Sequence, residues 1–199
     1  MHPAPDFTVT DPARLLAHLR RHPFMTFVGT PGGRPIVAHA PVVIRQGSER
    51  LILEFHLSRR NALADHLANG FRAVAISLGP DAYVSPDWYE SDDQVPTWNY
   101  LSVEAEGQVA PMDDAGLVGL LDDLSAQEEA RLAPKSAWTR GKMSPGRFDA
   151  MCRAIIGARL NVERIAGTFK FSQNRSDADR AGVASALGAH PMAGLMRDE

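Results

Sequence analysis

The stretch TWNYLSVEAEGQV, residues 97–109, decides the fold because its side chains alternate in character. Alternate side chains of a β-strand point to opposite faces. The mostly apolar odd positions should therefore face a core: Asn99, Leu101, Val103, Ala105, Gly107 and Val109. The even positions carry an aromatic pair followed by polar groups, as a binding surface or a subunit interface requires: Trp98, Tyr100, Ser102, Glu104, Glu106 and Gln108. A half-exposed strand with two ordinary aromatics is the alternative.

The chain before this strand has the turn residues of β-hairpins. A helix is expected from Pro12 to about His22, with Thr10 or Asp11 as its N-cap. Three consecutive antiparallel strands should follow, over residues 24–30, 36–44 and 51–57. The next expected elements are a short helix over 61–69 ended by Gly70, a strand over 73–78, and loops at Gly79-Pro80 and over 86–96.

The chain after residue 109 favours helices that flank the sheet. Helices are expected over 113–132 and from Ser144-Pro145 onward, packed together, the second with Phe148, Met151, Cys152 and Ile155 inward. A strand over 158–171 and a helix capped by Ser176 complete residues 1–188, and residues 189–199 should form a flexible tail. Short strands with interspersed helices predict a single domain that is mainly β (α+β), built on a closed or partly closed β-barrel.

Charge and composition limit the partners. The 199 residues include 21 Lys and Arg against 24 Asp and Glu, which argues against a surface devoted to nucleic acid. Residues 131–175, however, hold ten basic and two acidic residues. This excess suits a phosphate-bearing ligand, DNA, a dimer surface or an ordinary solvated face. The single cysteine, Cys152, and the lack of a long apolar run predict a soluble, cytoplasmic protein without membrane contact.

A first candidate site lies where a strand leads into a helix. Ser58, Arg59 and Arg60 precede Asn61, so a hydroxyl and two guanidinium groups come beside a helix N-terminus. Such a junction suits a terminal phosphate. The alternative is that Asn61 caps the helix while both arginines face solvent. The chain contains no GxGxxG or GxxxxGK[ST] motif, so neither a Rossmann site nor a P-loop is indicated.

Two histidines and a polar turn are further candidates. His39 and His56 lie on predicted strands, where they could contact an organic ligand, ligate haem or be core residues. Two histidines without a third ligand do not predict a metal site. Gln173 belongs to the run Ser172 to Arg175, which is either an ordinary polar turn or a set of donors.

Several motifs together resemble a known family. The runs GPDAYVSPDWY (79–89), VPTWNY (95–100) and KFSQNR (170–175) resemble the PaiB-type FMN-binding negative transcriptional regulators of bacteria. Residues 38–41 and 56–61 extend the resemblance to nearly the whole chain. It implies an FMN-binding split β-barrel of the pyridoxamine-phosphate-oxidase-like group, working as a homodimer with FMN at the subunit interface.

The resemblance also implies site residues and functions. The cofactor-binding candidates are His39, His56, Ser58, Arg59, Arg60, Asn61, Thr97, Trp98, Asn99, Tyr100 and Gln173. A flavin-dependent oxidoreductase is one implied activity, a negative regulator that contacts DNA is a second, and a haem-binding split barrel is a third. The family often has His, His, Leu and Pro where this chain has Asp81, Glu104, Ala40 and Ala62.

Overall fold

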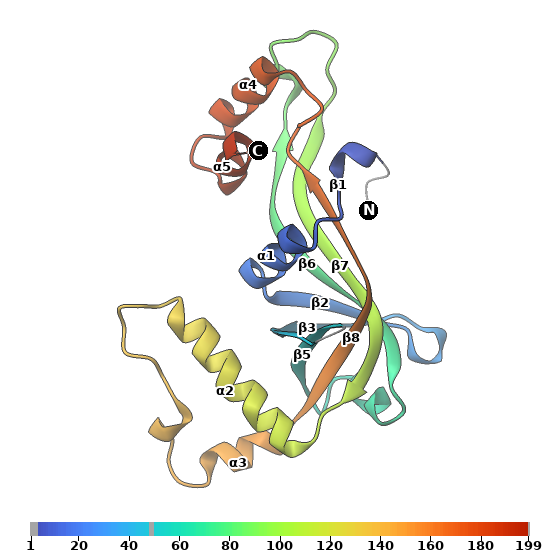
Figure 1. Cartoon of the computed structure of the whole chain (residues 1–199), viewed down its shortest axis with the longest axis vertical. Helices are drawn as coiled ribbons and strands as arrows, with labels where there is room; N and C mark the ends of the chain where they lie inside the picture. The colour runs from blue at the N-terminus through green and yellow to red at the C-terminus, as the bar shows by residue number, and fades with distance from the viewer. Residues whose placement is uncertain (1–3, 48–49, 199) are drawn as a thin grey trace. The chain divides into compact units, whose positions relative to one another are not determined.

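Strand β7, Thr97–Pro111, is the long strand that the alternation predicts. The computed structural model describes residues 4–47 and 50–198. Their contacts group into two compact units. Unit 1 comprises residues 1–22, 77–104 and 166–199, and unit 2 comprises residues 23–76 and 105–165. The long strands β6, β7 and β8 contribute residues to both units (Figure 1).

The sheet confirms the predicted class, which is mainly β with flanking helices. Its strand order is β3-β2-β6-β7-β8-β5-β4, with β1 paired to β8. The strands are β1 Thr8–Val9, β2 Phe24–Gly29, β3 Ile36–Pro41, β4 Val43–Gln46, β5 Leu51–Ser58, β6 Phe71–Val84, β7 Thr97–Pro111 and β8 Ile155–Lys170. The pairs β2–β3, β2–β6, β4–β5 and β5–β8 are antiparallel. The sheet forms a half-barrel, which lets the strands bury their apolar faces.

The longest helices are α1, α2 and α4. The α-helices are α1 Pro12–Arg21, α2 Asp114–Ala130, α3 Arg147–Cys152, α4 Asp177–Leu187 and α5 Pro191–Asp198. The 3-10 helices are η1 Pro5–Phe7, η2 Pro31–Gly33, η3 Ala64–Asn69, η4 Pro86–Trp88 and η5 Arg140–Lys142. Asp11, Asp113 and Ser176 accept backbone N–H bonds at the starts of α1, α2 and α4. The caps predicted for α1 and α4 are therefore confirmed.

Unit 2 is held by an aromatic pair and by α2. Phe27 and Phe55 stack with their ring centroids 4.0 Å apart. Leu120 and Leu124 of α2 form a buried cluster with Val43 of β4. These two leucines, four residues apart on one face of α2, pack against the sheet, as expected of a flanking helix.

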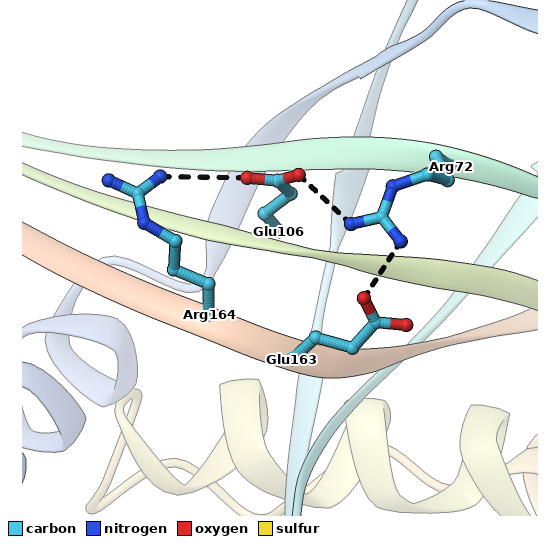
Figure 2. A network of polar contacts seen from close by, with 4 residues as sticks. All are labelled: Arg72, Glu106, Glu163 and Arg164. Atoms are coloured by element: carbon cyan, nitrogen blue, oxygen red, sulfur yellow. Dashed lines mark hydrogen bonds and ion pairs between the residues drawn. The ribbon is translucent and has the colours of Figure 1, made fainter.

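A network of ion pairs joins three strands of unit 2 (Figure 2). The Arg72 guanidinium of β6 lies 2.9 Å from a Glu106 oxygen of β7 and 2.8 Å from a Glu163 oxygen of β8. Arg164 adds a 3.5 Å contact to Glu106. These side chains are exposed or half-buried, so each pair contributes little alone, and the network mainly favours the observed strand register.

Unit 1 has helices around its own core. Leu15 and Leu19 of α1 are buried, as are Met192 and Met196 of α5. Helix α5 spans residues that the sequence analysis expects to be a flexible tail. Its buried methionines provide the apolar contacts that short helices need.

The predicted three-stranded meander is wrong. Residues 36–44 form two strands, β3 and β4, which lie at opposite ends of the sheet order. The break falls at Val42, whose N–H donates to the Pro23 carbonyl (2.9 Å) and whose side chain is fully buried. Pro41 has no N–H to continue a ladder, so the chain changes partners there. Ser48, placed in the next predicted turn, lies outside the described residues.

Two other expectations need correction. Gly79-Pro80 is not a loop but part of continuous β6. A Cβ at Gly79 would lie 3.0 Å from both the His18 ring and Leu101, so glycine serves close packing there. The helix expected from Ser144 begins at Arg147, after Gly146 in a left-handed conformation (φ 73°), and leaves Met151 exposed. Glycine tolerates that conformation at low cost.

Candidate functional site

The junction after β5 presents a hydroxyl and two guanidinium groups. Ser58, Arg59 and Arg60 are all exposed. Arg59 is fixed in place, because its Nε donates to the Arg153 carbonyl (3.1 Å) and its backbone N–H to the Ala154 carbonyl (2.9 Å). The guanidinium of Arg60 makes no ion pair with any residue that the structure describes. The segment therefore offers charge and donors to an anion.

The helix N-terminus predicted at this junction contributes less than expected. The following element, η3, is a six-residue 3-10 helix that starts at Ala64 instead of Asn61. The intervening amides are already bonded: Arg60 N–H to Ser58 Oγ (3.2 Å), and Leu63 N–H to Asn61 Oδ1 (2.9 Å). Asn61 thus stabilises a turn, and recognition of a phosphate here would depend on the guanidinium groups.

His56 lies at a mainly apolar cavity of about 350 Å³. The main lining side chains are Leu121 of α2, Trp138 of the following loop, Arg140 of η5, and Phe148 and Met151 of α3. His56 Nδ1 is buried and has no hydrogen-bond partner among the residues that the structure describes. Burial lowers the pKa of this histidine. A neutral imidazole in an apolar cavity can bond the polar edge of an organic ring.

A second cavity of unit 2, about 490 Å³, adjoins the first because Cys152 lines both. Arg59 and Arg153 contribute positive charge to it, whereas Asp114 and Asp149 contribute negative charge. A group with an apolar ring and an anionic end fits this pair of cavities, with the ring beside His56 and the anion toward Arg59. The two carboxylates oppose an anion, so the charge of Arg59 and Arg153 must outweigh theirs for an anion to bind.

His39 is not in either cavity. It is an exposed residue of β3, its Nδ1 is 3.0 Å from Thr26 Oγ1, and its ring stacks against Phe24 with centroids 6.5 Å apart. The structure therefore places His39 on a surface, together with an exposed aromatic residue.

The other predicted site residues belong to unit 1. Trp98 is exposed and meets Tyr83 edge-on, with ring centroids 6.0 Å apart, and Tyr100 is half-buried. Thr97 Oγ1 accepts a hydrogen bond from the Lys170 ammonium. Asn99 is fully buried, and its Nδ2 donates to Ser172 Oγ (3.0 Å).

The side chain of Gln173 makes its hydrogen bonds within the protein. Its Nε2 donates to the carbonyls of Phe169 (2.7 Å) and Asp6 (2.9 Å), while its Oε1 accepts from the Phe171 N–H (2.7 Å). Together with the Asn99–Ser172 bond, these contacts fasten the polar turn 171–175. A role of either amide as a donor to a flavin stays a prediction.

Sequence reasoning missed the residues around His56. Trp138, Arg140 and Phe148 lie more than 80 residues after His56 and reach the cavity only through the fold. The sequence signal that could have indicated this cavity was Trp138, a large aromatic residue in a loop that contains Pro and Ser. Such a side chain needs a packing partner. Among the residues with described positions, no group of three His, Cys, Asp or Glu side chains could hold a metal ion.

This half-barrel with flanking helices is the fold of the flavin-binding split-barrel proteins. The FAD and haem binding protein of Mycobacterium smegmatis matches with a TM-score of 0.60 and 20% identity, covering 92% of this chain and 80% of that one. The flavocytochrome Anf3 of Azotobacter vinelandii matches with a TM-score of 0.55 and 18% identity, covering 85% and 72%. At these low identities, both similarities show a shared fold alone.

The chain belongs to the family described as "Putative FMN-binding domain", whose model matches residues 1–164. The Bacillus subtilis protein named protease synthase and sporulation protein PAI 2 is 28% identical over 97% of this chain and 95% of its own length. The uncharacterized protein AN0679 of Emericella nidulans is 26% identical over 76% and 72%. The resemblance to the PaiB type is thereby confirmed. No helix in the described part of the chain is long and apolar enough to span a membrane.

Proposed function

We propose that this protein is a cytoplasmic, homodimeric FMN-binding protein of the PaiB type. The observation that carries the proposal is the pair of adjoining cavities in unit 2. One holds a buried, unpartnered His56 nitrogen among apolar side chains, and the other reaches Arg59. A ligand with an aromatic ring that has a polar edge, and with an anionic tail, would match these two cavities.

Each residue of unit 2 then has a task. Arg59, Arg60 and the Ser58 hydroxyl bind the phosphate, with Arg59 oriented by its bond to the Arg153 carbonyl. His56 bonds the ring edge, and Trp138 and Phe148 exclude water from the ring. Bound FMN would supply hydride or electron transfer, so a flavin-dependent oxidoreductase is the activity proposed.

Exposed apolar side chains support a homodimer. Phe24 and Val37 of unit 2 are 66% and 52% exposed, and Leu78 and Trp98 of unit 1 are 62% and 55% exposed. Large apolar side chains exposed on strands are typical of interaction surfaces. A partner subunit that covers Trp98 and Tyr100 would bring them toward a flavin, the role expected from the sequence.

A direct DNA-binding role has less support. Three of the basic residues in the segment 131–175 pair with acids of α2 and its surroundings: Arg131 with Glu128 (3.5 Å), Arg140 with Asp122 (3.1 Å), and Lys135 with Glu129. These pairs reduce the charge available for phosphates of DNA. A haem role for His56 would instead appear as a Soret band in the purified protein.

The replacement Arg59→Ala tests the phosphate assignment. We expect the Kd for FMN to rise at least tenfold, while the Kd for riboflavin, which lacks the phosphate, changes little. Flavin fluorescence titration measures both. Arg34→Ala, an exposed arginine of unit 2, is the matched control and should leave both constants unchanged. Equal losses for FMN and riboflavin would contradict the assignment.

A further inference from the structure

Unit 1 contains a small cavity whose lining side chains carry positive charge without a balancing negative charge. It measures about 230 Å³ and lies between the start of β7, the end of β8 and the turn that follows β8. Its lining includes Lys170, Arg175, Tyr89, Thr97 and Asn174, and no acidic side chain. The family model ends at residue 164, so Lys170 and Arg175 lie beyond the region that it matches.

The two cations of this cavity have no carboxylate partner among the residues described. Lys170 Nζ donates to the Thr97 hydroxyl and lies 5.6 Å from the centroid of the Phe7 ring. The Arg175 guanidinium lies over the Tyr89 ring, 5.5 Å from its centroid. Burial and the nearby Arg175 both lower the pKa of Lys170. Two positive groups that share a partly dry cavity repel each other unless an anion lies between them.

Tyr89 provides a donor without an acceptor. The residue is only 9% exposed, and its hydroxyl oxygen is buried with no hydrogen-bond partner in the described part of the chain. Buried hydroxyls are nearly always bonded, so an unbonded one in a cavity wall suggests a missing ligand atom. A phenol can donate to an oxyanion alongside an ammonium and a guanidinium group.

The backbone around the cations is held in a strained conformation. Ser172 has a φ of 61°, which lies in the left-handed region that non-glycine residues rarely adopt. Asn99 and Gln173 fasten this turn through the hydrogen bonds described above. Such strain persists where the surrounding structure over-determines it, and it clusters at ligand sites. The turn at Ser172 places Arg175 near enough to Lys170 to influence its charge.

We infer that this cavity of unit 1 is a binding site for a small oxyanion, a carboxylate or a phosphate monoester, held by Lys170, Arg175 and the Tyr89 hydroxyl. Its volume lies below the range typical of sites for drug-sized ligands, so the occupant is a smaller molecule than a flavin nucleotide. The inference is independent of FMN binding in unit 2.

The chain contains three lysines, which makes the site directly observable. Protein labelled with ¹³C in its lysines should show separate side-chain signals for Lys135, Lys142 and Lys170. Inorganic phosphate and, separately, acetate are titrated against chloride at matched ionic strength. A saturable shift of the Lys170 signal alone supports the site, and the tighter of the two anions identifies the chemical class. Non-saturable shifts of all three signals, or no shift of the Lys170 signal with either anion, would overturn it.

Variants locate the site. Arg175→Gln should weaken binding of the preferred anion at least tenfold, Arg175→Lys should weaken it less, and Arg34→Gln, with the same loss of charge, should have no effect. Tyr89→Phe should weaken binding while keeping the fold. If Arg175→Gln binds the anion as wild type does, the inference fails. It also fails if saturation with FMN abolishes the Lys170 response, because the site would then be the flavin's.

Discussion

At the scale of single residues, Asn99 links the aromatic strand to the strained turn. Its side chain is fully buried and bonds Ser172, whose backbone is left-handed. Asn99→Ala removes this bond and leaves the Ser172 hydroxyl buried without its partner. We expect a loss of about 2 kcal/mol in the free energy of unfolding, measured by urea denaturation. Asn69→Ala, at an exposed site, should cost less than about 0.5 kcal/mol, and equal costs would contradict the role of Asn99.

His18 makes the stability depend on pH. Its Nε2 donates to the Ser77 carbonyl (3.1 Å), and burial lowers its pKa from 6.5 to about 4. Between these values the unfolded chain takes up a proton that the folded protein does not, so stability falls as the pH falls through this window. The loss for this group should approach about 3 kcal/mol.

Urea denaturation at pH 7.5 and pH 4.5 tests this prediction. His18→Leu should lose less stability between the two pH values than wild type, although it is less stable at pH 7.5 because Ser77 loses its donor. His66→Gln changes a half-buried histidine that takes no part in the bond to Ser77 and should keep the wild-type dependence. A His18→Leu variant with the same pH dependence as wild type would show that another group is responsible.

At the scale of elements, β7 and β8 approach closely at Gly107. A Cβ there would lie 1.9 Å from the Asn161 carbonyl oxygen, which is backbone and cannot move independently. Gly107→Ala should therefore destabilise the protein by about 3 kcal/mol or more in urea denaturation. Gly119→Ala is the matched change, because Gly119 is an exposed residue of α2 with nothing within 4 Å of a new Cβ. It should stabilise by about 0.5–1 kcal/mol. Equal effects of the two changes would contradict the close packing.

The elements differ in how well the sequence predicts them. The face that β7 buries follows from the alternation of its side chains, and the starts of α1 and α4 follow from capping residues, so local signals suffice. The break at Val42 depends on which strands pair, and no local signal reports pairing. Helix α5 was missed because its stability comes from the burial of Met192 and Met196, which only the tertiary structure supplies.

At the scale of the whole molecule, one part of the candidate site follows from local sequence patterns and another part depends on the fold. Ser58, Arg59 and Arg60 could be selected from the sequence because consecutive donors at a strand end are a local pattern. The cavity of His56 could not, since its walls come from α2, a loop and α3, brought together by folding. The helix N-terminus expected at Asn61 was wrong, because η3 starts at Ala64 and amides before it are already bonded.

The central claim is that the chain binds FMN, in line with the description of its family as a "Putative FMN-binding domain". Purified protein is titrated into a fixed concentration of FMN, and flavin fluorescence is recorded with the visible absorption spectrum. We predict a saturable change in fluorescence with one FMN per chain, flavin bands in the spectrum, and no Soret band. Fluorescence that shows no saturation at any protein concentration tested would contradict the account.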